Sequence, residues 1–284
     1  MTPPKLTVIL AETKHADPSP AIAAILTACE GVPAEIILVG ESLGVRPPEV
    51  SEHVPSPRGS LTPVRWGLGL AKARGDIVAF TTSELLVHPQ WARKLLETFT
   101  DRVAGAAGGI ELWPRAGPAQ CAMYLLRYSA FVPARPGPPR PVADIPGDTG
   151  AYRRSALLAH PDLLERGVWE VEFHRRFLRD GLLLMRLPES LATFAGKATF
   201  VASMQQRYEH GREFGRARVR RLGEAKARVV AAAPLVPMVL TVRILRRVAI
   251  RSLGRGRVLA AMIPLLLLSG AWALGEAIGA LRDG

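Results

Sequence analysis

The chain has 284 residues, enough for one domain of more than 200 residues with an appendage, or for two small domains. Hydrophobic residues make up 48% and charged residues 22%, which excludes a disordered or collagen-like chain. Its two cysteines, Cys29 and Cys121, exclude a disulfide scaffold and a zinc site built from cysteines.

The positive charge of the chain is concentrated in one stretch. The 37 basic and 25 acidic residues give a formal net charge of +12, which at first points to a nucleic-acid partner. Residues 205–257 contain 14 basic and three acidic residues, a net charge of +11, so the rest of the chain is almost neutral. Few aromatic residues are interleaved with these charges, and we therefore expect no nucleic-acid partner.

Strand and helix patterns alternate through the first hundred residues. We predict strands at 6–11, 35–39 and 76–80, and helices at 17–29, 68–74 and 89–99. Residues 44–63 are rich in Pro, Ser and Gly, which predicts a loop with at most one short strand. This alternation is typical of an α/β fold with parallel strands.

The pattern continues less regularly to residue 204. We predict strands at 104–113 and 182–187, a turn followed by a helix at 147–158, and a helix at 168–179. Residues 133–141 contain five prolines and form either an extended surface spacer or a lid over a site. From Ala202 the chain is expected to be helical and basic.

Two apolar runs follow, at residues 229–242 and 258–275. The second has 18 residues without a charge, and as a helix of about 27 Å it just spans the hydrocarbon layer. The first is shorter and contains Pro234 and Pro237, so we expect an interfacial or re-entrant helix. The six arginines between the runs favour anionic lipid headgroups as partners and a location on the cytoplasmic side.

We therefore expect three parts. Residues 1–204 form the globular domain, residues 205–228 a basic juxtamembrane helix, and residues 229–284 a membrane-associated helical segment. No N-terminal signal peptide is visible, so the globular domain is expected at the cytoplasmic face of the cell membrane.

Several short motifs occur in the order found in one enzyme family. Gly69, Leu70, Ala73, Gly75 and Asp76 fall at the spacings that family 2 glycosyltransferases with the GT-A fold show before the strand that carries their Asp-any-Asp motif. Residues 6–13, 35–42, 147–154 and 169–176 agree in order with the family's first two strands, its pre-acceptor segment and its base-bearing helix. Over about residues 5–215 the chain resembles this family.

The resemblance implies a GT-A-like α/β fold, with a mixed, mostly parallel sheet flanked by helices, followed here by a C-terminal apolar helical hairpin. The family's metal motif reads Thr82-Ser83-Glu84, so its first acid is missing. The acidic end of the second strand reads Gly40-Glu41-Ser42.

The resemblance also implies roles for five residues besides the base. Glu84 would bind a divalent cation (Mg²⁺ or Mn²⁺), Thr13 and Glu41 would contact the nucleotide, Arg65 would pair with the diphosphate, and Asp148 would touch the sugar or the acceptor. Hard oxygen ligands and a planar guanidinium suit these tasks. Each residue also has an ordinary interpretation as a strand-end acid, a turn acid, a surface arginine or a helix cap.

For the catalytic base, Glu170 occupies the position of the family's Asp, next to Trp169. Glu172 is the alternative, and because residues two apart on a helix do not share a face, only one of them can point into a site. When a carboxylate accepts the proton of the acceptor hydroxyl while the hydroxyl oxygen attacks the donor directly, the anomeric configuration inverts.

We thus expect a membrane-associated glycosyltransferase that moves a sugar from a nucleotide donor, a uridine diphosphate sugar, to a hydroxyl of a lipid-linked or envelope glycan acceptor. The alternative is a non-catalytic nucleotide-sugar-binding or scaffolding relative, which the missing acid of the metal motif favours. A sugar nucleotidyltransferase would carry a Gly-rich basic loop after its first strand, and residues 11–20 lack one.

Overall fold

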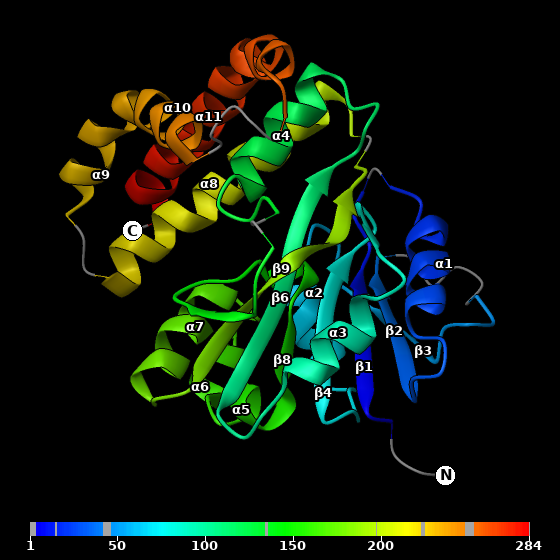
Figure 1. Cartoon of the computed structure of the whole chain (residues 1–284). Helices are drawn as coiled ribbons and strands as arrows, with labels where there is room; N and C mark the ends of the chain where they lie inside the picture. The colour runs from blue at the N-terminus through cyan, green and yellow to red at the C-terminus, as the bar shows by residue number, and fades with distance from the viewer. Residues whose placement is uncertain are drawn as a thin grey trace. The chain divides into compact units, whose positions relative to one another are not determined.

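The structure is a computed structural model that describes residues 4–14, 16–41, 47–133, 136–196, 198–222, 225–247 and 253–283. The chain divides into two compact units: Met1–Trp113 with Pro133–Gly196, and Pro114–Val132 with Lys197–Gly284 (Figure 1). The expected boundaries at residues 204 and 228 stay predictions. Ser42, residues 44–46 and 134–135 of the expected loops, and Arg251 lie outside the described residues.

The first unit is built on one sheet, which has nine strands in the described residues. These are β1 (Leu6–Ala11), β2 (Ala34–Gly40), β3 (Glu52–Pro55), β4 (Ile77–Thr82), β5 (Leu85–Val87), β6 (Val103–Leu112), β7 (Arg140–Val142), β8 (Ala151–Arg153) and β9 (Leu183–Phe194). The order is β3-β2-β1-β4-β8-β6-β9-β5, with β7 also paired to β9. The expected mixed sheet is confirmed.

Parallel pairing is less extensive than expected. Strands β3, β2, β1 and β4 are parallel, as are β6 and β9, but β8 is antiparallel to both β4 and β6, and β5 and β7 are antiparallel to β9. Every residue of β1 is buried, because it lies between two strands with helices on both faces of the sheet.

The helices of this unit are α1 (Ser19–Ala28), α2 (Thr62–Leu70), α3 (Trp91–Thr98), α5 (Arg154–Leu158), α6 (Pro161–Leu164) and α7 (Glu170–Arg179), with a 3₁₀ turn η1 at Gly147–Thr149. One core cluster joins Trp66 of α2 and Phe173 and Phe177 of α7 to Ile9 and Phe80 of the sheet. Figure 1 shows α2 behind the sheet and α3 in front of it.

Two predicted boundaries in this unit are wrong, and the short strands β5, β7 and β8 were not predicted. The helix expected at residues 68–74 begins at Thr62, with Pro63 in its first turn, and ends at Leu70. Position 67 of this helix requires glycine, because an added Cβ there would be 2.8 Å from the Cα of Gly167. The strand expected to end at residue 187 continues to Phe194, because Pro188 falls in a bulge of the pairing with β6.

The second unit is helical in its described residues. It contains α4 (Pro118–Tyr128), which the sequence did not indicate, α8 (Phe200–Leu222), α9 (Lys226–Ala232), the 3₁₀ turn η2 (Ala233–Leu235), α10 (Val236–Arg247) and α11 (Arg255–Asp283). Two helical segments, Lys226–Arg247 and Arg255–Arg282, are long and apolar enough to cross a membrane by length and composition. The two apolar C-terminal helices are thus confirmed.

Four glycines let α8 and α11 touch backbone to backbone. A Cβ added at Gly275 of α11 would lie 2.1 Å from the carbonyl oxygen of Tyr208, and one at Gly211 of α8 would lie 2.1 Å from that of Trp272. Gly215 and Gly279 repeat this contact one turn further along. Spaced in this way, small residues permit the close helix approach that is common in membranes.

Candidate active site

The carboxyl ends of three parallel strands meet at one edge of the sheet. Strands β1, β2 and β4 are neighbours, and the chain reaches β2 on one side of β1 and β4 on the other. Such a switch in strand order is where α/β sheets bind ligands. Thr13 follows β1, Glu41 follows β2, and Glu84 follows β4, so the fold brings these three expected site residues to the same edge.

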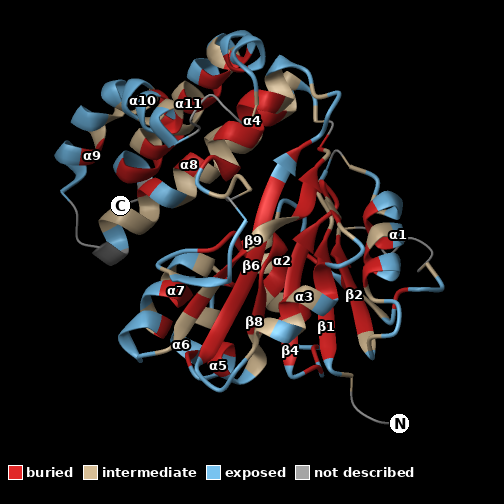
Figure 2. Ribbon diagram, viewed as in Figure 1, coloured by how far each residue is buried: buried red, intermediate tan, exposed pale blue. Residues whose placement is uncertain are grey.

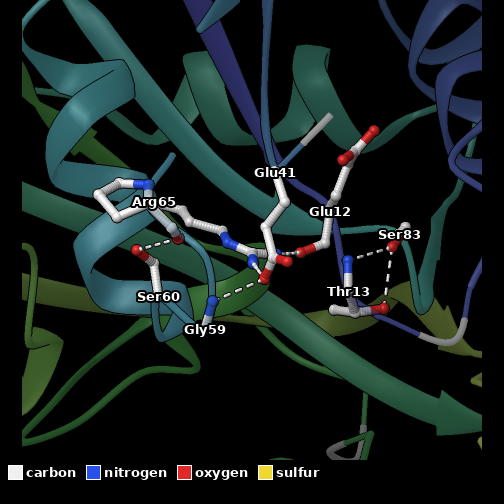
Figure 3. A network of polar contacts seen from close by, with 8 residues as sticks. Glu12, Thr13, Glu41, Gly59, Ser60, Arg65 and Ser83 are labelled. Carbon is white, nitrogen blue, oxygen red and sulfur yellow. Dashed lines mark hydrogen bonds and ion pairs between the residues drawn. The ribbon is translucent and has the colours of Figure 1, made fainter. Parts of the chain in front are cut away.

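Arg65 of α2 joins the ends of β1 and β2 (Figure 3). Its side chain is buried, with Nη2 2.7 Å from the Oε1 of Glu41 and Nη1 donating to the carbonyl oxygen of Glu12. The backbone N–H of Gly59 donates to the same Glu41 oxygen at 2.9 Å. The guanidinium expected to meet a diphosphate is thus engaged with the protein in this structure and holds Glu41 in place.

The Glu41 carboxylate is stabilised in its charged form. The hydrogen bond from the Gly59 amide holds the pKa of Glu41 below its usual range. Burial raises this pKa, and the positive charges of Arg65, Lys14 and Arg58 lower it further. Its side chain is 27% exposed. It is therefore a fixed anionic acceptor for hydrogen bonds from a ligand.

Thr13 and Ser83 connect the ends of β1 and β4. The Thr13 backbone N–H donates to the Ser83 hydroxyl at 2.9 Å, and the two hydroxyl groups are 3.0 Å apart (Figure 3). Ser83 is the middle residue of the degenerate metal motif, and no role was expected for it. The motif therefore holds the two strand ends together at this edge.

Glu84 follows directly and is buried, with 5% of its surface exposed. Its carbonyl oxygen accepts from the Ala195 N–H at 2.9 Å, and a Cβ at Gly196 would lie 2.9 Å from its Oε1. In the part of the chain that the structure describes, no group of three or more His, Cys, Asp or Glu side chains could hold a metal. A cation held here by Glu84 as its single protein ligand would need diphosphate and water oxygens as its remaining ligands.

Glu170 and Asp148 lie next to the end of β4. Glu170 is the first residue of α7, and a Cβ at Gly147 would be 2.7 Å from its Cγ, so its side chain lies against the η1 turn that contains Asp148. This turn enters β8 beside β4, where the Phe80 N–H donates to the carbonyl oxygen of Gly150 at 3.0 Å. Both acids are therefore placed near the strand edge that carries Ser83.

Glu172 has different surroundings. Burial raises the pKa of Glu172 above its usual range, although the positive charges of Arg166 and Arg175 lower it; the negative charge of Asp162 raises it further. These neighbours belong to α7 itself and to the segment around α6 that precedes it. Of the two candidate bases, Glu170 is the one packed against η1.

Comparisons with known proteins show which solved structures the fold resembles. No protein-family model matches the chain, and no curated protein matches it. Among solved structures, it is similar to the mannosyltransferase PcManGT from Pyrobaculum calidifontis in complex with GDP-Man and Mn²⁺, with 14% identity and a TM-score of 0.53. The match covers 99% of this chain and 88% of that one. The chain therefore shares the fold of this structure.

Proposed function

We propose that the chain is a GT-A glycosyltransferase similar to family 2, which transfers a sugar from a nucleotide-sugar donor to a hydroxyl group. The observation that carries the proposal is the convergence of Thr13, Glu41, Glu84 and Glu170 on one edge of the sheet, at its switch point. The likeness to a structure that binds GDP-Man and Mn²⁺ supports a nucleotide-sugar donor and a divalent cation.

The donor nucleotide would lie over the ends of β1 and β2. Glu41, held by Arg65 and Gly59, accepts hydrogen bonds from the ribose hydroxyl groups or from the N–H groups of the base, with Thr13 beside it. In this scheme Arg65 acts through Glu41. A uridine diphosphate sugar is the donor expected from the sequence, and GDP-mannose is the donor of the similar structure, so both belong in the assay.

The transfer step needs a base on the far side of the anomeric carbon from the diphosphate. Glu170 accepts the proton of the acceptor hydroxyl while that oxygen bonds to the anomeric carbon. The carbon–oxygen bond to the diphosphate breaks, its electron pair leaves with the nucleoside diphosphate, and the anomeric configuration inverts. Asp148, on the turn next to Glu170, orients the sugar or the acceptor.

A Mg²⁺ or Mn²⁺ ion held by Glu84 would neutralise charge on the leaving diphosphate. The protein supplies one buried carboxylate for it, and the donor supplies the other anionic oxygens. This arrangement predicts that cation binding is weak without donor and strong with it.

The helical unit carries the features of a membrane anchor. Large apolar side chains are exposed on α10 (Met238, Val239 and Val242) and on α11 (Leu259, Ile263 and Leu267), and Figure 2 shows much of α10 in the colour of exposed residues. Basic residues flank these helices. We propose that they seat the enzyme on anionic lipids at the cytoplasmic face, which favours a lipid-linked or envelope glycan acceptor.

Flotation of the full chain with lipid vesicles tests this anchor. Binding to phosphatidylglycerol-containing vesicles that exceeds binding to phosphatidylcholine vesicles is expected. Equal absence of binding to both would contradict the proposal for the helical unit and leave the catalytic proposal to its own test.

Donor turnover tests the enzyme proposal. The full chain is incubated with UDP-glucose, UDP-galactose or GDP-mannose, with Mn²⁺ or with EDTA, and released nucleoside diphosphate is measured, with water as the default acceptor. Mn²⁺-dependent release from at least one donor is expected. Donor binding without any release would favour the non-catalytic alternative, and neither binding nor release would overturn both.

A further inference from the structure

Three side chains from separate segments of the first unit form a hydrogen-bonded chain. The Nδ1 of His174 lies 2.5 Å from the Oδ1 of Asp144, and its Nε2 lies 2.9 Å from the hydroxyl oxygen of Tyr152. His174 and Tyr152 are each 1% exposed, whereas the Asp144 side chain is 49% exposed. The chain thus begins at the surface and ends inside the protein.

The partners decide where the protons lie. The Asp144 carboxylate accepts, so Nδ1 of His174 carries a proton and donates it, and this tautomer leaves Nε2 as an acceptor for the Tyr152 hydroxyl proton. Burial, followed by the negative charges of Glu170, Asp144 and Asp148, raises the pKa of Tyr152 well above its usual range. Tyr152 therefore remains a neutral donor, directed at a buried acceptor.

The three residues lie on the helix that carries Glu170 and on the two segments that flank η1. His174 lies four residues after Glu170 on α7, so the two side chains share a face of the helix. Asp144 precedes the η1 turn against which the Glu170 side chain packs, and Tyr152 follows it in β8. The ring of Tyr152 also stacks on the imidazole of His174, with 5.7 Å between their centroids.

His174 therefore connects the two segments that flank η1 to the helix that carries Glu170. Because the imidazole of His174 is buried, removing either Asp144 or Tyr152 leaves one of its ring nitrogens without a hydrogen-bond partner. Nothing in the transfer step requires His174 to touch substrate.

We propose that His174 is a positioning residue of the transfer reaction, which holds Glu170 against the η1 turn through its bonds to Asp144 and Tyr152. The inference rests on the proposed function and adds to it how the carboxylate is held. Because His174 lies on the same face of α7 as Glu170, its two hydrogen bonds hold this face of the helix against the segments that flank η1.

The same helix supplies a matched control. The Nε2 of His160 lies 3.2 Å from the Oδ2 of Asp180, the residue that follows α7. The His160 ring packs against Phe173 and Phe177 of this helix. This is also a buried histidine paired with a half-exposed carboxylate. It contacts α7 at positions other than Glu170 and His174, so its loss tests the effect of a missing His–Asp pair alone.

The test compares His174→Gln and Tyr152→Phe with His160→Gln. Nucleoside diphosphate release gives kcat and the donor KM, donor titration gives Kd, and thermal unfolding reports folding. We expect kcat to fall about 10- to 100-fold for His174→Gln and by a smaller factor for Tyr152→Phe. The donor KM and Kd should change less than about threefold, since the nucleotide contacts are made elsewhere. His160→Gln should keep the wild-type kcat.

Three outcomes separate this inference from the function on which it rests. If the wild type turns over and both His174→Gln and Tyr152→Phe keep its kcat, the positioning role is overturned and the proposed function stands. An equal fall of kcat in His160→Gln and His174→Gln would also overturn it, because any lost pair would then suffice. No turnover by the wild type would remove the proposed function itself.

Discussion

Replacing Gly147 by alanine should displace the Glu170 carboxylate without changing its chemistry. The added Cβ would lie 2.7 Å from the Cγ of Glu170 and 2.9 Å from its Cδ. Ordinary contacts of this kind begin at about 3.4 Å, so one of the two groups must move by roughly 0.7 Å. The side chain is the more mobile of the two, because the Gly147 backbone belongs to the hydrogen-bonded η1 turn.

A shift of this size is large for a catalytic base. Misplacement by about 1 Å costs a reaction about 100-fold, so we expect kcat for nucleoside diphosphate release to fall about 10- to 100-fold. The free energy of unfolding should fall by about 1–3 kcal/mol, the usual range for overpacking. The donor Kd should stay near the wild-type value, since Glu41 and Thr13 are untouched.

The assay is nucleoside diphosphate release under saturating donor, with donor titration and thermal unfolding on the same samples. Gly137→Ala is the control, because a Cβ there meets nothing within 4 Å. If Gly147→Ala binds donor, folds, and turns over at the rate of Gly137→Ala, then contact between Glu170 and η1 does not matter for catalysis and the reasoning is refuted.

Three further changes probe other parts of the molecule. Arg65→Met leaves the Glu41 carboxylate without its guanidinium partner and should raise the donor Kd about tenfold, as isothermal titration would measure; an unchanged Kd would remove Glu41 from the donor site. Gly275→Val, but not Gly270→Val, should lower the unfolding temperature of the helical unit, because only the first brings a Cβ within 2.1 Å of a backbone oxygen; equal effects would contradict the packing. Burial raises the pKa of Glu35, but hydrogen bonds from neighbouring hydroxyl, amide and guanidinium groups lower it overall below its usual value of 4.5. The loss of stability in Glu35→Gln should therefore be full above about pH 4.5 and should vanish as the pH falls through the folded-state pKa. A stability difference between Glu35→Gln and the wild type that persists at acid pH would contradict this.

The longer buried strands of the sheet were the most predictable elements, whereas the three-residue strands β5, β7 and β8 were not predicted. Continuous β-branched runs such as residues 6–11 are buried on both faces and have few alternatives. The start of α2 was not predictable, because glycine disfavours a helix interior and the contact that requires Gly67 there is with Gly167, one hundred residues later. Helix α4 was missed for a similar reason, since the helices that cover its apolar face come much later in the chain.

The candidate site shows the same limit. Thr13, Glu41 and Glu84 can be placed at one edge from the sequence, since each follows a strand of the parallel group. Their contacts cannot, because the pairing of Arg65 with Glu41 depends on where α2 begins. The link from Asp144 to Tyr152 through His174 is likewise set by tertiary packing.

The central claim, that Glu170 is the base of a glycosyl transfer, is tested most directly by Glu170→Gln beside Glu172→Gln. The amide keeps the size of the side chain and removes its ability to accept a proton. The account predicts that Glu170→Gln binds the nucleotide-sugar donor with the wild-type Kd and releases no measurable nucleoside diphosphate, while Glu172→Gln keeps the wild-type rate. Wild-type release by Glu170→Gln, or loss of release only in Glu172→Gln, would contradict it.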